Sequence, residues 1–231
     1  MIGESQPWAL EVGRSEMQSP RVGSSSWRES NAVRVRVTLL GIDPPIWRRL
    51  VLPIGWNLHQ LHFGIQAAFN WWNTHLHEFR IGALTFGDVT GEVEAGERDL
   101  DERTITLHHL DYGIRAEPFL YHYDFGDGWY HRVEIEERLT LDAKPRYGSC
   151  VDGARAGPPE DVGGTDGYER FLDIMANATH PEHADMAAWC GGHFDPEWFD
   201  VERVDRDMRN ALRKDPKRRL HQPKPRTVTA R

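Results

Sequence analysis

Residues 119–136 read FLYHYDFGDGWYHRVEIE and form the most regularly patterned segment of the chain. Aromatic side chains occupy every second position up to residue 125. After Gly126-Asp127-Gly128 the alternation resumes, with Trp, His, Val and Ile against Tyr, Arg and Glu. Period-two patterning on both sides of a glycine-bounded aspartate is typical of a β-hairpin. We therefore expect a central antiparallel hairpin here.

The register of this hairpin depends on the length of its turn. A two-residue turn of Asp127 and Gly128 would place Asp124 opposite His131, a carboxylate–imidazole pair, but it would mix apolar and polar side chains on each face. A three-residue turn, 126–128, keeps one face apolar or aromatic, and a slip of one residue would expose that whole face. We predict the three-residue turn, with His131 on the core face and no Asp124–His131 pair. The predicted cross-strand pairs are Phe125–Trp129, Tyr123–His131, Tyr121–Val133 and Phe119–Ile135.

The length and composition fit one soluble domain with two tails. The chain has 231 residues, of which 39% are hydrophobic and 28% are charged, and nine tryptophans add large apolar side chains. Residues 1–30 are serine-rich and lack periodicity, which predicts a disordered N-terminal extension. The predicted domain spans residues 31–213, and residues 214–231 form a basic tail that we expect to be disordered.

The net charge of −8 conceals an asymmetry. The segment from Lys214 to Arg231 has seven Lys or Arg and one Asp, a net charge of +6, so the other 213 residues carry −14. Because phosphate neutralisation dominates affinity for nucleic acid, an acidic body argues against nucleic-acid binding except through that tail. Two cysteines and no apolar stretch of membrane-spanning length predict a cytoplasmic protein that does not interact with membranes.

The segments before the hairpin predict two strands and a helix. Residues 33–39 and 46–52 have the alternation of half-buried strands. Asn57 is suited to cap a helix that runs to about Asn70, since the apolar residues of this segment share one face. His62 is at the margin of that face, where a hydrogen-bonded structural histidine is a commoner outcome than a ligand.

Residues 74–81 predict a third strand, with His75 and His77 on its inner face. Two imidazoles at this spacing on a strand suit a metal ion, although an apolar face that becomes polar near its end is the commoner explanation. The acidic segment 87–103 predicts a solvent-exposed loop. A short strand is expected at 104–107.

The glycine- and proline-rich segment 147–168 predicts a long loop, and such loops are usually functional or disordered. It contains Cys150, a candidate nucleophile, although no catalytic signature surrounds this thiol and an inert role is the alternative. Glu160 and Asp161 of the same loop are candidates for acid–base chemistry. Helices are predicted at 168–176, at 181–189 and after the capping residue Asp200.

Strands followed by helices favour an α+β fold over a doubly wound one. We expect a single domain with a twisted, mostly antiparallel sheet, one early helix and three later helices packed on it. The predicted strands begin near residues 33, 46, 74, 104, 119 and 129.

Four segments together resemble the plasmid pRiA4b ORF-three-like family. In order they are WNLHQLHFGIQAAFNWWNTHLHEFRI, FLYHYDFGDGWYHRVEIE, CVDGARAGPPEDVGGTDGYERFLDIM and WCGGHFDPEWFD. The resemblance covers about Val33 to Leu212. It implies an uncharacterised α+β protein of bacteria or archaea associated with plasmids or other mobile elements, also labelled a TnpR-like passenger protein of insertion elements. The residues that match its motifs are His62, Trp71, His75, His77, Asp124, Gly126, Asp127, Trp129, His131, Cys150, Pro158, Pro159, Glu160, Asp161, Gly163, Gly164 and Tyr168.

The TnpR label implies recombination chemistry that the residues do not support. A serine resolvase requires a nucleophilic serine with arginines around the scissile phosphate and a helix-turn-helix domain, and neither constellation is evident in the sequence. The acidic body is also unsuited to duplex DNA.

Three functions remain, and the sequence leaves open whether the protein is an enzyme. The first is a binding or accessory protein that holds an unknown small molecule or protein in an aromatic- and histidine-lined groove. The residues expected to line that groove are His62, Trp71, Asp124, Trp129 and Tyr168.

The second function is a metal-dependent hydrolase. His75, His77 and His131 would bind a divalent metal such as zinc if their strands adjoin, and Asp127, Glu160 or Asp161 would complete the shell. The third is metal-free chemistry, with Cys150 as nucleophile and a motif histidine as base, or with Glu160 and Asp161 as acid and base.

Overall fold

The structure is a computed structural model that describes residues 30–90, 99–113, 117–214 and 221–223. The predicted N-terminal extension, apart from Ser30, lies outside the described residues, as does most of the basic tail. No helix in the described ranges is long and apolar enough to span a membrane.

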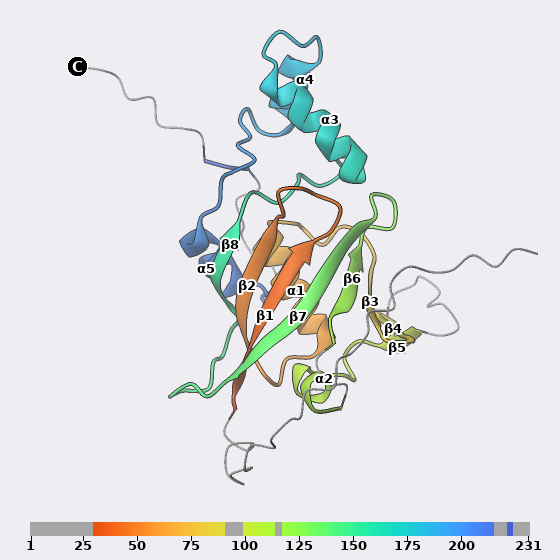
Figure 1. Ribbon diagram of the computed structural model, residues 1–231, viewed down its shortest axis with the longest axis vertical. Coiled ribbons are helices and arrows are strands. Elements are labelled where there is room, and N and C mark those ends of the chain that lie inside the picture. The colour runs from red at the N-terminus through yellow and green to blue at the C-terminus, as the bar shows by residue number, and fades with distance from the viewer. Residues whose placement is uncertain (1–29, 91–98, 114–116, 215–220, 224–231) are drawn as a thin grey trace, which may run out of the picture.

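An eight-stranded sheet forms the centre of the molecule, in the order β5-β4-β3-β6-β7-β1-β2-β8 (Figure 1). All neighbouring strands are antiparallel except β4 and β5, which are parallel. This arrangement confirms the predicted α+β class with a mostly antiparallel sheet. The strands are β1 (Ala32–Leu39), β2 (Trp47–Pro53), β3 (His77–Ile81), β4 (Leu84–Gly87), β5 (Asp99–Asp101), β6 (Phe119–Tyr123), β7 (Trp129–Leu139) and β8 (Ser149–Ala154).

Helix α1 (Leu58–Phe69) covers one face of the sheet, and α5 (Val201–Met208) packs against both α1 and β8 (Figure 1). Helices α3 (Gly164–Ala176) and α4 (His183–Trp189) contact each other beyond one end of the sheet. The sequence did not predict α2 (Leu107–Gly113), near the opposite end.

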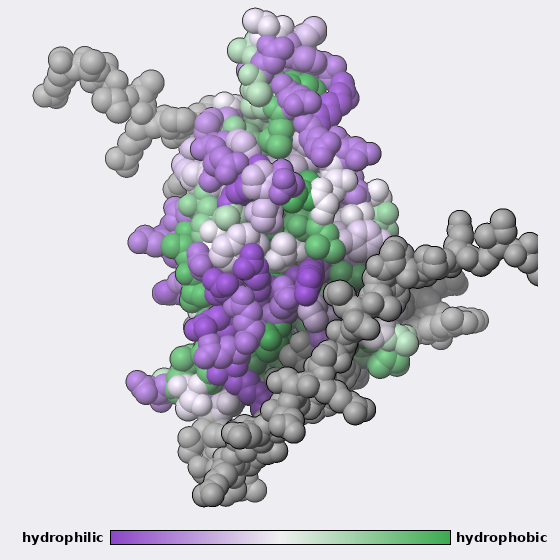
Figure 2. All heavy atoms as spheres, viewed as in Figure 1, coloured by the Kyte–Doolittle hydropathy of each residue, from purple (hydrophilic) through white to green (hydrophobic). Residues whose placement is uncertain are grey.

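The two faces of the sheet differ in the way that the alternation of β1 predicts. Val33, Val35 and Val37 are fully buried in the core that the sheet shares with α1. On the other face, arginines of β1 and β2 pair with glutamates of β7, and Figure 2 shows hydrophilic residues gathered over these strands. Because one face is buried and one is charged, the register of each strand is strongly specified.

The predicted capping of α1 is confirmed. The Asn57 side chain accepts a hydrogen bond from the backbone N–H of Gln60, and the Gln60 side chain accepts one from the backbone N–H of Asn57. This reciprocal arrangement satisfies two N–H groups that the first turn leaves without helical partners. Asn70 ends the helix in the left-handed conformation, with φ 63°.

The predicted hairpin register is wrong by two residues. Tyr121 pairs with His131 and Tyr123 with Trp129, so five residues, 124–128, connect the strands. The turn is longer because Asp124 leaves the ladder with φ 56°, donates its backbone N–H to Leu76 and accepts at its carbonyl from Gly128. A shift of two preserves the faces, and His131 is buried in the core as predicted, whereas Phe125 is 51% exposed instead of paired with Trp129.

Two loop predictions are also wrong. Segment 147–168 contains β8, an edge strand paired with β2, and it includes the start of α3. Gly153 lies in β8, where it pairs with Arg48 of β2. The position requires glycine because a Cβ there would be 2.6 Å from the Phe199 ring. Segment 87–103 contains β5, and its Glu102 is fully buried.

The predicted strand at 104–107 is absent as well, since Leu107 starts α2 and Thr106 makes only an isolated bridge to Asn57. The strand predicted at 74–81 starts at His77, which leaves His75 in the preceding loop.

Candidate functional site

Three segments that are distant in the sequence meet beside the β6–β7 turn. Asp124 opens the turn, and its Oδ1 accepts hydrogen bonds from the backbone N–H groups of Gly126 and Asp127 at 3.0 and 3.3 Å. Asp127 Oδ2 in turn accepts from the backbone N–H of Gly163, 3.1 Å away in the loop after β8. The turn and this loop are therefore tied together by their own side chains.

His75 lies between two carboxylates of this junction. Its Nε2 is 3.0 Å from Asp161 Oδ1 and 3.6 Å from Asp124 Oδ2. Both aspartates have left-handed backbones, with φ 59° at Asp161 and 56° at Asp124. Such conformations are uncommon for residues other than glycine, although Asp and Asn tolerate them best, and they often occur at functional sites.

Glu160 fixes the loop after β8 to the segment before β3. Its carboxylate accepts from the Tyr123 hydroxyl, from the backbone N–H of Trp72 at 2.9 Å and from the Thr74 hydroxyl at 3.4 Å. Burial raises the pKa of Glu160, and these hydrogen bonds offset part of the effect. Burial, together with the neighbouring Glu160 carboxylate, raises the pKa of Tyr123. The hydroxyl therefore stays protonated and donates.

A cavity of about 210 Å³ opens beside this junction, between the end of α1, the loop 156–161 and residues 189–207. Its apolar walls include three tryptophans and three phenylalanines. Its carboxylates are Glu160, Asp161 and Asp207. These aromatic rings belong to Trp72, Trp189, Trp198, Phe69, Phe194 and Phe199. Apolar walls with a few polar groups are typical of small-molecule sites.

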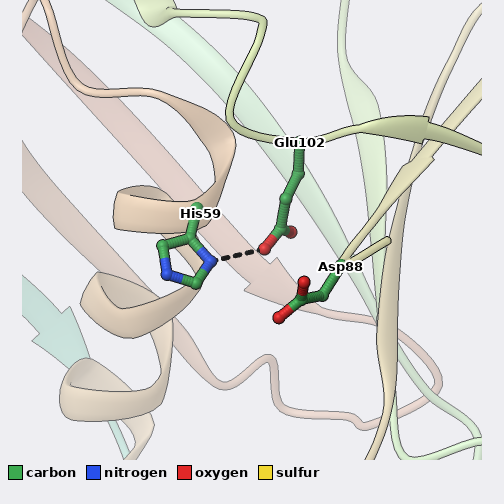
Figure 3. Close-up of side chains that lie close together, drawn as sticks. All are labelled: His59, Asp88 and Glu102. Atoms are coloured by element: carbon green, nitrogen blue, oxygen red, sulfur yellow. Dashed lines mark hydrogen bonds and ion pairs between the residues drawn. The ribbon is translucent and has the colours of Figure 1, made fainter. Parts of the chain in front are cut away.

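A second polar cluster lies near the start of α1 (Figure 3). Glu102 is fully buried and accepts from His59 Nδ1 at 2.6 Å and from His77 Nε2 at 2.7 Å. Burial raises the pKa of Glu102, but the hydrogen bonds from the two histidines outweigh this effect and lower it to about 2. Asp88 lies beside the cluster and is bound by Arg103 at 2.9 and 3.1 Å.

The ligand atoms of this second cluster are already engaged. His59, Asp88 and Glu102 place ligand atoms within 4.8 Å of one another, but hydrogen bonds occupy the imidazole nitrogens and carboxylate oxygens that face each other. A metal ion would have to displace these bonds. The sequence did not single out Glu102, because it stands in an acidic, glycine-containing segment without periodicity.

His62 belongs to a closed hydrogen-bond network. Its Nε2 lies 2.6 Å from Asn73 Oδ1 and its Nδ1 lies 2.7 Å from the Tyr121 hydroxyl. Gln66 donates to that hydroxyl at 3.1 Å and accepts from the backbone N–H of Asn73 at 2.8 Å. Burial, aided by the nearby His77, lowers the pKa of His62 well below its ordinary value. A neutral His62 that donates through Nε2 and accepts through Nδ1 satisfies every member of this network.

Comparison with known proteins identifies the family. Residues 31–203 match the family model described as plasmid pRiA4b ORF-3-like protein. The chain belongs to the plasmid pRiA4b ORF-3-like family. This finding confirms the family resemblance that the four sequence segments indicate.

Two relatives extend this result. The chain is 39% identical over 163 residues to the uncharacterised protein y4hQ of Sinorhizobium fredii, and the match covers 70% of this chain and 82% of that protein. The crystal structure of MM3350, a protein of unknown function from Methanosarcina mazei Go1, matches with a TM-score of 0.66 and 33% identity. That match covers 74% of this chain and 96% of the solved chain.

Most of the pRiA4b ORF-3-like motif residues that we expected in a ligand groove are instead in the core. Trp71, Trp129 and Tyr168 are at most 1% exposed, His62 is similarly buried, and none of them lines the 210 Å³ cavity. Trp71 donates through Nε1 to the carbonyl of Pro158 at 2.9 Å and therefore anchors the loop 156–161 to the core. Asp124 is the member of this group that takes part in the junction with His75.

The three histidines proposed for zinc do not form one group. His77 stacks on His62 at a centroid distance of 3.5 Å and binds Glu102, while His75 faces Asp124 and Asp161. His131 packs against the aromatic rings of Phe69, Trp71 and Tyr121. A three-histidine metal centre is therefore not formed in this arrangement.

Cys150 is also in a setting that disfavours a nucleophile. The side chain is buried, and this burial raises the pKa of the thiol to about 11, even though Arg48 opposes the shift. A reactive cysteine requires a lowered pKa and access for its substrate. Cys190 is likewise free and buried.

His131 gives a testable pH dependence. Burial lowers its pKa to about 3, and the nearby main chain of Tyr121 and Trp129 offsets only part of this effect. Neither ring nitrogen makes a hydrogen bond of normal geometry within the described part of the chain. Between pH 6.5 and 3 the unfolded chain therefore takes up a proton at this position that the folded chain does not.

We expect the free energy of unfolding to fall as the pH drops below about 6.5, by about 1.4 kcal/mol per pH unit from this residue. In His131→Leu this contribution disappears, so urea unfolding at pH 7, 6 and 5 should give a shallower loss of stability than in the wild type. An unchanged slope in the variant would show that His131 is not buried in its neutral form.

Proposed function

We propose that this protein binds a small ligand with an apolar or aromatic body and a positive charge in the 210 Å³ cavity. The observation that carries the proposal is the lining of the cavity, where aromatic side chains surround a space that also contains three carboxylates. Such walls bind flat or aliphatic groups by burial, and the faces of tryptophan rings attract cations.

Two tryptophans support a role in binding rather than in stability. Trp72 is 44% exposed and Trp189 is 45% exposed, although both line the cavity. A folded domain gains little from tryptophan rings that remain half in water, whereas a ligand placed between them would bury this apolar area. Trp198 adds a third ring, over which the guanidinium of Arg203 lies.

The charge of the site supports a cationic ligand. Asp207 has Arg203 as its neighbour at 4.0 Å, and Arg48 donates its hydrogen bonds to main-chain carbonyls. The lining therefore has three carboxylates against two guanidinium groups, and Glu160 and Asp161 make its charge negative on the side of the loop 156–161. Outside the basic tail the chain carries a charge of −14, which raises the local concentration of cations.

A matched set of compounds tests this proposal. Benzamidine, benzamide and benzoate have nearly the same size and differ in charge, so calorimetric titration of each should give affinity in the order cation, neutral, anion. The differences in affinity between the three compounds should shrink at high salt, because ions screen the carboxylates of the cavity.

Matched tryptophan variants locate the binding. Trp72→Ala and Trp189→Ala should each weaken benzamidine binding by roughly tenfold, which corresponds to about 1.4 kcal/mol. Trp47→Ala should not, since this ring lies on the outer face of the sheet between Arg36 and Arg49. Absence of saturable binding by all three compounds, or equal loss in the Trp47 variant, would contradict the proposal.

Association with plasmids or other mobile elements stays a prediction that follows from the family. A binding protein is compatible with an accessory role of that kind, since it requires no recombination chemistry of its own.

A further inference from the structure

We propose that His75, Asp124 and Asp161 bind a divalent transition-metal ion such as zinc. The three side chains offer one imidazole nitrogen and two carboxylate oxygens within 4.8 Å of one another. This site shares only His75 with the three-histidine centre that the sequence suggests, and it shares Asp161 with the lining of the neighbouring cavity.

The distances between the ligand atoms fit a metal ion. A metal held about 2.1 Å from each ligand sets neighbouring ligand atoms about 3.0 Å apart for octahedral angles and about 3.4 Å apart for tetrahedral angles. In the structure His75 Nε2 is 3.0 Å from Asp161 Oδ1 and 3.6 Å from Asp124 Oδ2. Small side-chain rotations would therefore complete the coordination.

The His75 nitrogen lacks a hydrogen-bond partner, which separates this group from the cluster around Glu102. Nε2 of His75 is shielded from solvent, yet within the described residues it makes no hydrogen bond of normal geometry, even to Asp161 Oδ1. In the other cluster, His59 and His77 both form hydrogen bonds to Glu102. A shielded nitrogen without a hydrogen-bond partner lowers stability. A metal ion bound between His75, Asp124 and Asp161 would give His75 Nε2 this missing partner.

Both aspartates are held in place before any metal binds. Asp124 uses Oδ1 to accept from the turn and leaves Oδ2 to face His75. Asp161 follows Glu160, which is anchored to Trp72 and Tyr123, and it precedes Gly163, which is bound to Asp127. Preorganised ligands reduce the entropy that binding would otherwise cost.

The site has access for the ion and room for further ligands. The Asp161 side chain is 69% exposed, so the ion can enter from solvent and retain water or a substrate group in its remaining positions. One imidazole with two carboxylates suits zinc or manganese better than magnesium, which prefers oxygen ligands alone. The competing explanation is a polar contact between His75 and the two aspartates that binds no metal.

Zinc titration of the full-length chain, without a histidine tag and after dialysis against a chelator, distinguishes these explanations. We expect one zinc per chain, and magnesium should not compete at the same concentration. Asp161→Asn and His75→Ala should each weaken zinc binding by roughly 100-fold or more. Asp161→Asn is the cleaner variant, because asparagine also tolerates the left-handed backbone and the residue is exposed.

Asp88→Asn and His59→Ala are the matched controls, since they remove ligand atoms from the second group. Both should keep wild-type zinc affinity. Cobalt substitution adds a spectroscopic readout, because bound Co²⁺ absorbs in the visible range according to its ligands. No zinc binding in the wild type, unchanged affinity in Asp161→Asn, or loss confined to the Asp88 and His59 variants would overturn the proposal.

Discussion

Replacing Arg48 with methionine should lower the free energy of unfolding by about 3–5 kcal/mol. The Arg48 side chain is buried, and four of its N–H groups donate to main-chain carbonyls at 2.8 Å. Methionine would remove the donors of these carbonyls at a position where the side chain is only 3% exposed. The accepting carbonyls belong to Trp47, Ala68, Ala154 and Arg155.

Charge is retained at this position in the folded protein. Burial lowers the pKa of Arg48 to about 10, while the nearby Cys150 opposes the shift, so the guanidinium stays protonated at neutral pH. The side chain connects β2 to the end of α1 and to the chain after β8, and it therefore joins the sheet to two walls of the cavity.

Arg49→Met is the matched control, because the neighbouring arginine points to the other face of the sheet. Arg49 pairs with Glu136 and Asp152 in positions that solvent reaches, and such pairs contribute about 0–1 kcal/mol. Guanidinium chloride unfolding of both variants should therefore separate them clearly. Equal stability losses would show that the carbonyl contacts of Arg48 do not contribute as we infer.

The second large effect is expected for Gly164→Ala, which should destabilise the protein by about 2–4 kcal/mol. A Cβ at this position would lie 2.4 Å from the carbonyl oxygen of Asp127, so the loop after β8 and the β6–β7 turn could not keep their present contact. The backbone at Gly164 also has φ +70°, which disfavours side chains other than glycine. Separation of the two segments would move Asp161 away from Asp124, and zinc affinity should fall as well.

Gly82→Ala separates backbone strain from steric overlap. Gly82 has φ +58° in the β3–β4 turn, but a Cβ there would meet nothing within 4 Å. This control should therefore lose only about 1 kcal/mol, from the left-handed backbone alone, and keep its zinc affinity. Thermal unfolding together with zinc titration measures both effects. A Gly164 variant as stable as the Gly82 variant would show that the two segments are not in close contact.

Alternation predicted much of the sheet because it reports which side of a strand is buried. It placed β1, β2, β6 and β7, and it put His131 in the core, since a register error of two residues preserves the faces. It could not predict the length of the β6–β7 turn, which depends on hydrogen bonds between Asp124, Leu76 and Gly128. Leu76 is distant in the sequence, and local patterns carry no information about such contacts.

Edge strands gave weaker signals. In β8 the glycine and aspartate of SCVDGA are typical of loops, and the strand forms because β2 offers a partner. Similarly, Asp99–Asp101 pairs with β4 from within an acidic segment. Each strand forms through its pairing partner, so tertiary context outweighs local propensity.

The sequence identified residues of the candidate site, but it did not show which of them lie together. His75, Asp124, Asp127, Glu160 and Asp161 were all singled out, and the structure brings them to one junction. The aromatic walls of the cavity were missed, because Trp72 lies far in the sequence from Trp189 and Trp198, and no periodic pattern links these residues. Convergence of single residues from separate loops is a property of the fold.

The central claim is that the cavity between α1, the loop 156–161 and residues 189–207 binds a cationic ligand. Tryptophan indole N–H signals in nuclear magnetic resonance spectra test this claim most directly, because titration with benzamidine reports on each ring separately. We predict saturable shifts for Trp72, Trp189 and Trp198, with the signals of Trp47 and the buried Trp129 unchanged. Shifts at Trp47 alone, or no saturable shift at any cavity tryptophan, would contradict it.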